Sequence, residues 1–428
     1  MSTLLITLPH TASHVLPGLP IAEAFVKRGH RVLFHTDPCN AAKVQAAGAE
    51  LVPMSRRCDV IHRMSDGSSA KVPAWLPKFL RQVLYFRHEV LTMVPDMMAE
   101  LESIAQREGV DCILGDLFGF GASYAAERLN VPYATLIIVW PDVADARGVP
   151  VLLESTPFPA GLIHAFTNFL FPLHRVRQQM GLPARPPQAP AEFFAVVNSR
   201  TLNLATCHRE FIATEHLQEN QLFIGPITDQ VTRSTDTPDY GESLEPGTVL
   251  ILYSTAYKED QGQFRDVVES VAALGVPVLA VPGSLQNLSL DFPANVRVEE
   301  FVHMDEVMPY IRAIVSFAGC GTVGRVFRAG VPALLISDNS DTLPIARRAE
   351  ELGVAYHLPK HKITRERLHA KLKALLADEA LHVQVKALSD QLNAMDPPQE
   401  VAAIALEGLL PKAQPSAEVA ADTLQKVG

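Results

Sequence analysis

The sequence predicts an α/β protein with two doubly wound parallel sheets, one in each half of the chain. Its 428 residues are too many for one ordinary hydrophobic core. Short apolar runs alternate with helical segments in both halves, which is the pattern of βαβ units. A polar stretch rich in Thr, Asp, Pro and Gly separates the halves at 227–247. We therefore expect a first domain over 1–226, a linker over 227–247 that acts as a hinge, a second domain over 248–410 and a loose tail over 411–428.

The first half contains five apolar runs of strand length. Strands are expected at 3–9, 31–37, 49–54, 111–116 and 133–139. Helical patterns cover 19–30, 77–105 and 121–130, and Gly29 closes the first of them. Residues 140–200 lose the alternation and carry many prolines, with one apolar helix expected over 162–176. Such an insertion either shapes a substrate pocket or serves only for packing.

The second half repeats this organisation without repeating the sequence. Strands are expected at 248–255, 276–283, 295–301, 313–319, 332–338 and 355–358, with helices over 260–274, 322–330 and 344–353. Ligands of such sheets bind at the carboxyl ends of the strands. The loops that follow the strands are therefore where a functional site is expected.

Composition and charge exclude several classes of protein. Lys plus Arg is 37 and Asp plus Glu is 47, so the formal net charge is −10, which is unsuited to nucleic-acid binding. The five cysteines are scattered and form no C-x-x-C pair, which predicts reduced thiols rather than a disulfide framework or a zinc site. The start of the chain has no basic segment typical of a secretion signal, and no apolar run is long enough to cross a bilayer. We expect a cytoplasmic protein without a membrane span.

A glycine-rich turn stands out in the second half. Gly319, Gly321 and Gly324 have the spacing G-x-G-x-x-G, between an expected strand and an expected helix. One interpretation is an NAD-dependent oxidoreductase. That interpretation is weakened because the motif lies late in the chain and because Asp338, the nearest acid after a strand, comes too soon for a ribose-binding carboxylate. The alternative is a turn that approaches another diphosphate.

Several segments, taken in order, resemble the UDP-glycosyltransferases with the GT-B fold that modify small lipophilic molecules. They are "SHVLPGLPIAEAFVKRGHRVLF" near the start, "VDCILGDLFGFGASYAAERLNVPYATL", "FIGPI" before the linker, the stretch from "NVRVEEF" to "GVAYHL", and the C-terminal "RERLHAKLKALLAD" and "EVAAIALEGLL". The resemblance covers nearly the whole chain. It implies two Rossmann-like domains facing a cleft, the first binding the acceptor and the second a nucleotide diphosphate sugar, UDP- or TDP-linked. It implies no further cofactor and no metal.

The resemblance also assigns residues on the acceptor side. The family's catalytic base corresponds to His14, expected on the loop between the first strand and first helix, and its partner carboxylate corresponds to Asp116. A histidine is suited to deprotonating a hydroxyl, and a carboxylate can hold its ring in one tautomer. Read without the resemblance, His14 is a loop histidine facing solvent and Asp116 a helix N-cap. Phe118 and Trp140 are expected to contact the acceptor.

The donor side departs from the family's pattern. Phe317 stands where the family has a histidine, Arg325 where it has a ribose-binding glutamate, and Thr342 where it has a glutamine. Backbone N–H groups of the turn can still bind a diphosphate at a helix N-terminus. Arg325 either supplies the missing positive charge or points to solvent. The expected donor-binding residues are Ser254, Thr255, Val302, Gly319, Gly321, Thr322, Arg325, Asp341 and Thr342.

Two interpretations besides the oxidoreductase therefore stay open. The first is a working, inverting glycosyltransferase that acts on a small lipophilic acceptor. The second is a GT-B protein that is catalytically silent or repurposed, binding a ligand or partner or performing other chemistry in the acceptor pocket. The replaced donor-side residues favour the second, and the retained His14 and Asp116 favour the first.

Overall fold

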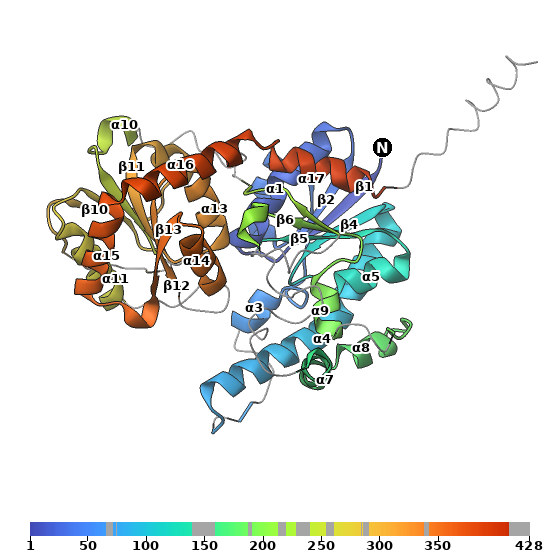
Figure 1. Ribbon diagram of the computed structural model, residues 1–428. Helices are drawn as coiled ribbons and strands as arrows, with labels where there is room; N and C mark the ends of the chain where they lie inside the picture. The colour runs from blue at the N-terminus through green and yellow to red at the C-terminus, as the bar shows by residue number, and fades with distance from the viewer. Residues whose placement is uncertain are drawn as a thin grey trace, which may run out of the picture.

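Two parallel sheets, each flanked by helices, form two domains that lie side by side (Figure 1). The computed structural model describes residues 1–65, 72–73, 75–138, 159–186, 191–212, 220–227, 240–253, 261–283, 285, 291–337 and 342–410. Within them, the first sheet has seven strands in the order β3-β2-β1-β4-β5-β6-β7 and the second has six in the order β10-β9-β8-β11-β12-β13. The paired strands run parallel. The predicted fold class is confirmed.

The first sheet contains the five expected strands and two more. Its strands are β1 (Thr3–Thr7), β2 (Arg31–Thr36), β3 (Glu50–Pro53), β4 (Cys112–Asp116), β5 (Tyr133–Ile137), β6 (Leu202–Ala205) and β7 (Gln221–Phe223). Every residue of β1, β4 and β5 is buried, as expected for central parallel strands. Strands β6 and β7 escaped sequence analysis because they are short and because β6 carries a polar Asn203 among its apolar residues.

The helices of the first domain correct two expectations. They are α1 (Ala12–Lys27), α2 (Ala41–Ala46), α3 (Val60–Ser65), α4 (Lys78–Glu108), α5 (Ala122–Leu129), α7 (Ala160–Leu170), α8 (Leu173–Gln179) and α9 (Glu192–Val197). Helix α1 begins at Ala12, well before the expected start at residue 19, and it includes Pro17 as well as Pro20. The single helix expected over 162–176 is two helices, because the chain breaks at Phe171 and Pro172.

The second domain follows the expected alternation closely. Its strands are β8 (Thr248–Leu252), β9 (Val278–Val281), β10 (Val296–Val298), β11 (Ile311–Ser316), β12 (Ala333–Ser337) and β13 (Ala355–Pro359). Its helices are α10 (Tyr240–Ser243), α11 (Gln261–Ala272), α12 (Met304–Val307), α13 (Cys320–Ala329), α14 (Thr342–Glu351), α15 (Arg365–Ala377), α16 (Glu379–Ala394) and α17 (Pro398–Glu407). Of the expected linker, 228–239 lie outside the described residues, and so does the expected tail.

Helix α17, the last of the chain, packs on the first domain rather than the second. Figure 1 shows it beside α1, and Ala402, Ala403 and Leu406 are buried in the core that includes the α1 residues. Glu407 accepts hydrogen bonds from Arg28 and from His30 Nε2, at 2.6 and 2.9 Å. The chain thus crosses between the domains twice, once before β8 and once before α17.

Helix α13, which follows the glycine-rich turn, is pressed against the end of the first domain. The ring of Phe327 stacks on that of Phe211, with centroids 5.4 Å apart and planes 2° from parallel. Arg328 Nη1 donates to the carbonyl of Pro226 at 2.9 Å. A Cβ on Gly324 would stand 2.7 Å from Pro226 Cβ, so this third glycine of the motif is required by close packing between domains.

We predict that Gly324→Ala lowers the Tm by several degrees, because overpacking a rigid proline contact costs roughly 1–3 kcal/mol. The matched control is Gly321→Ala, three residues earlier in the same helix, where a Cβ meets nothing within 4 Å. That variant should keep or raise the Tm, since alanine favours a helix over glycine by about 1 kcal/mol. Equal melting temperatures for the two variants, measured by calorimetry, would refute the packing role of Gly324.

Candidate active site

His14 and Asp116 meet at the carboxyl edge of the first sheet. Asp116 is the last residue of β4, and β4 pairs with β1, whose chain continues into α1. His14 lies in the first turn of α1, not on the preceding loop as expected, because the helix begins at Ala12. His14 Nδ1 is hydrogen-bonded to Asp116 Oδ2. Residues that are 102 positions apart are therefore in direct contact because their strands are neighbours.

The carboxylate of Asp116 is fully buried and held on both sides. Its Oδ1 accepts a hydrogen bond from the backbone N–H of Phe118 at 2.9 Å. The backbone carbonyl of Asp116 accepts one from the N–H of Gly119, also at 2.9 Å. Helix α5 begins at Ala122 with Gly121 as N-cap, so Asp116 is not a helix cap. A fixed carboxylate opposite Nδ1 favours the tautomer with its hydrogen there, which leaves Nε2 of His14 as a proton acceptor.

Phe118 lies against this pair. Its ring centroid is 5.1 Å from that of His14, with the planes 34° apart. His14 is only 7% exposed, so its ring is shielded from bulk water on most sides. The apolar ring of Phe118 beside the His14 imidazole suits the binding of a mostly apolar small molecule. Trp140, the other expected acceptor contact, lies outside the described residues.

The glycine-rich turn has an open face at the start of α13. Gly319 is the N-cap, without a side-chain cap, and a Cβ on Gly319 or Gly321 would meet nothing within 4 Å. Ala318 has a φ of 51°, a left-handed conformation that costs a residue with a side chain roughly 1–2 kcal/mol. The first turn of α13, which includes Thr322, thus offers backbone N–H groups and the positive end of a helix dipole to an anion.

The two side chains that replace the family's polar residues at this turn lie in different surroundings. Phe317 is buried, with its ring centroid 4.6 Å from that of Tyr253, so it offers no hydrogen bond. Arg325 does not point freely to solvent: its Nη1 lies 3.8 Å from Asp305 Oδ2 on α12, and its side chain is half-buried. Lys360 Nζ lies 5.5 Å from the centre of the Phe317 ring.

The remaining expected donor residues are only partly described. Val302, just before α12, and Thr342, the first residue of α14, are both buried. Ser254, Thr255 and Asp341 lie outside the described residues. The structure therefore brings together the two predicted catalytic residues, and of the expected polar donor residues it describes Thr322, Arg325 and Thr342.

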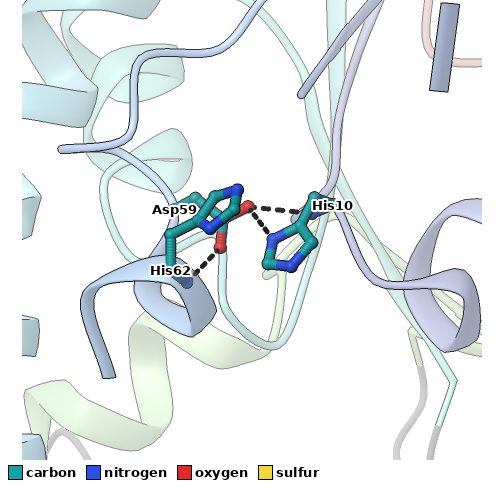
Figure 2. A group of neighbouring side chains, drawn as sticks. All are labelled: His10, Asp59 and His62. Atoms are coloured by element: carbon teal, nitrogen blue, oxygen red, sulfur yellow. Dashed lines mark hydrogen bonds and ion pairs between the residues drawn. The ribbon is translucent and has the colours of Figure 1, made fainter. Parts of the chain in front are cut away.

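Sequence analysis missed one group of polar residues, His10, Asp59 and His62 (Figure 2). Asp59 is 49 residues from His10, so no short spacing could have revealed the group. Their potential metal-ligand atoms lie within 4.8 Å of one another. The two imidazoles, however, are stacked, with centroids 3.7 Å apart and planes 14° from parallel. Lone pairs in two nearly parallel planes do not converge on one ion, so this arrangement does not form a metal site without rotation of a ring.

None of the five cysteines forms a disulfide, as expected. Among the described residues, no helix combines the length and the apolar character needed to cross a bilayer.

Comparisons with known proteins point to glycosyltransferases. Residues 265–408 match the family model described as erythromycin biosynthesis protein CIII-like, C-terminal domain. The chain is 24% identical over 399 residues to 4'-demethylrebeccamycin synthase of Lentzea aerocolonigenes, covering 90% of this chain and 94% of that protein. It is 25% identical over 416 residues to demethyllactenocin mycarosyltransferase of Streptomyces fradiae, covering 93% and 84%.

Solved structures share the fold of both domains. The glycotransferase of kitacinnamycin superposes with a TM-score of 0.75 at 21% identity, over 96% of this chain and 99% of that one. Spinosyn rhamnosyltransferase SpnG complexed with thymidine diphosphate superposes with a TM-score of 0.67 at 19% identity, over 94% and 99%. Together, these matches show that the chain is similar over nearly its whole length to glycosyltransferases of the natural-product type and has their two-domain GT-B fold.

Proposed function

We propose that this glycosyltransferase moves a sugar from a thymidine or uridine diphosphate sugar to a hydroxyl or amine of a small, mostly apolar molecule. The observation that carries the proposal is the buried pair formed by His14 and Asp116 at the carboxyl edge of the first sheet. A histidine held by a carboxylate is suited to general-base catalysis near neutral pH. The thymidine alternative is supported by the related rhamnosyltransferase that was solved with thymidine diphosphate.

The proposed chemistry is one displacement with inversion at the anomeric carbon. His14 Nε2 takes the proton of the acceptor hydroxyl as its oxygen forms a bond to the anomeric carbon. The bond from that carbon to the diphosphate breaks, and its electron pair leaves with the diphosphate. Asp116 stabilises the imidazolium that results. The open turn at Gly319–Thr322 stabilises the negative charge of the leaving diphosphate through backbone N–H groups and the α13 dipole.

A second candidate, a GT-B protein repurposed for other chemistry or binding, is favoured by one observation. The position that precedes the turn is occupied by Phe317, buried against Tyr253, and Arg325 is directed toward Asp305. A diphosphate at the turn would then depend mainly on the main chain. Binding of nucleoside diphosphates therefore decides between the two candidates.

We predict that His14→Ala lowers kcat by roughly 10²- to 10⁴-fold, the usual contribution of a general base. Nucleotide binding should be nearly unchanged, because the base acts on the acceptor. Asp116→Asn should lower kcat in the same direction, since an amide does not enforce the Nδ1–H tautomer. Steady-state kinetics and circular dichroism on the folded variants provide the measurement. A His14→Ala enzyme that keeps more than about a tenth of its turnover has its base elsewhere.

We predict that Arg325→Ala weakens nucleoside diphosphate binding by about 1.5–3 kcal/mol, the range for a charge-assisted hydrogen bond. Asp305→Asn should instead strengthen it, because it releases Arg325 from its ion pair. Arg312→Ala is the matched control, since Arg312 lies near the amino end of β11 and donates to the carbonyl of Leu376. Calorimetric titration with thymidine, uridine and guanosine diphosphates measures all three variants.

The outcomes separate the two candidates. Wild-type protein that binds none of these nucleotides is the repurposed protein and not a glycosyltransferase. If the wild type binds a nucleotide and Arg325→Ala does not weaken that binding, the glycosyltransferase candidate stands. The diphosphate is then bound by main-chain N–H groups and not by Arg325.

A further inference from the structure

His10 is held by a buried carboxylate in the same way as His14. Its backbone N–H and its ring Nδ1 both contact Asp59 Oδ2, at 2.9 and 2.7 Å (Figure 2). The other oxygen of Asp59 accepts the backbone N–H groups of Ile61 and His62 at the start of α3, at 2.9 and 3.2 Å. With Nδ1 facing a carboxylate, the neutral ring carries its hydrogen there and presents Nε2 as an acceptor.

The pairs His10–Asp59 and His14–Asp116 share their construction. Both histidines follow β1, four residues apart. In each pair Oδ2 meets the ring Nδ1, while Oδ1 is fixed by main-chain N–H groups. Asp59 is 1% exposed and Asp116 is 0% exposed. The difference lies in accessibility, since the His10 side chain is 22% exposed and the His14 side chain 9%.

His62 fixes the plane of the His10 ring. The two rings stack at 3.7 Å, and His62 Nε2 lies 3.1 Å from Asp37 Oδ2. The pKa of Asp37 is lowered, mainly by a hydrogen bond from the backbone N–H of Cys39, which outweighs the opposing effect of burial. This carboxylate therefore stays charged beside His62. Stacking and two carboxylates thus hold His10 in one orientation, which is what a recognition group needs and a merely exposed histidine lacks.

The group lies at the same edge of the sheet as His14. Asp37 directly follows β2, His10 follows β1, and Asp59 precedes α3 after β3. These connections all leave the carboxyl ends of parallel strands, where α/β proteins bind their ligands. The first domain therefore presents two oriented imidazoles at its ligand-binding edge, of which the proposed reaction uses one.

We propose that His10 Nε2 binds a second hydroxyl of the acceptor, distinct from the one that receives the sugar. This inference rests on the proposed function. The second hydroxyl donates a hydrogen bond to Nε2, while Asp59 holds the ring hydrogen on Nδ1 and so keeps Nε2 as the acceptor. His10 is then a specificity residue that selects polyhydroxylated acceptors over those with a single hydroxyl.

The test compares acceptors that differ in their number of hydroxyls. Umbelliferone carries one, whereas esculetin and quercetin carry several at different spacings, and UDP-glucose and TDP-glucose serve as donors. His10→Phe preserves a flat ring against His62 and removes both ring nitrogens. It should raise KM about tenfold for a polyhydroxylated acceptor, leave kcat within about threefold and leave umbelliferone unaffected, as expected for the loss of one hydrogen bond.

His30→Phe is the matched control. His30 also binds a carboxylate, Glu407, and also stacks on an aromatic ring, that of Phe25, but it lies at the amino end of β2. It should change no KM, and melting curves should show that both variants are folded. The same KM change for all acceptors, or no change for any, overturns the role of His10 while leaving the proposed function standing. A wild-type protein that transfers to none of the acceptors overturns both.

Discussion

The parallel pairing of β1 with β4 at the centre of the first sheet is the constraint on which the site depends. Leu4 pairs with Cys112 and Ile6 with Leu114, so the two strands end side by side. Both strands are buried along their whole length and pack against a core on each face, so a one-residue shift of register would exchange the side chains of the two cores. The same register that fills these cores therefore also sets His14 against Asp116. Core packing and the contact between these two residues are here determined by one set of strand contacts.

The glycine-rich motif illustrates how one pattern serves two purposes. Gly319 and Gly321 face open space, whereas Gly324 is needed because Pro226 of the other domain comes so close. The G-x-G-x-x-G spacing suggests that all three glycines approach a phosphate. In the structure, the first two are open to a ligand and the third allows the two domains to pack together. The stacking of Phe211 on Phe327 reinforces this junction. The proposed diphosphate site is therefore in direct packing contact with the end of the first domain.

The sequence predicted the architecture well because strand and helix periodicity is a local signal. The start of helix α1 was misjudged, since the helix was expected from residue 19 and begins at Ala12, and β6 was missed because it is only four residues long. The pairing of His14 with Asp116 could be anticipated only through resemblance to a family, and the structure confirms the contact. The pairing of His10 with Asp59 could not be anticipated, because it joins the segments that follow β1 and β3, which are distant in sequence and separated by β2 in the sheet.

The return of the chain to the first domain through α17 limits how the two domains can move. A domain joined to another by one connecting segment can rotate in every direction. A second connection at another point restricts it to rotation about the line through both connections. The connections here lie close together: a Cβ on Gly225, just before the first crossing, would stand 3.3 Å from Met395 Cε, just before the second. The two connections therefore form one pivot near Gly225 and Met395. A rotation of one domain against the other would displace most the surfaces that lie farthest from this pivot.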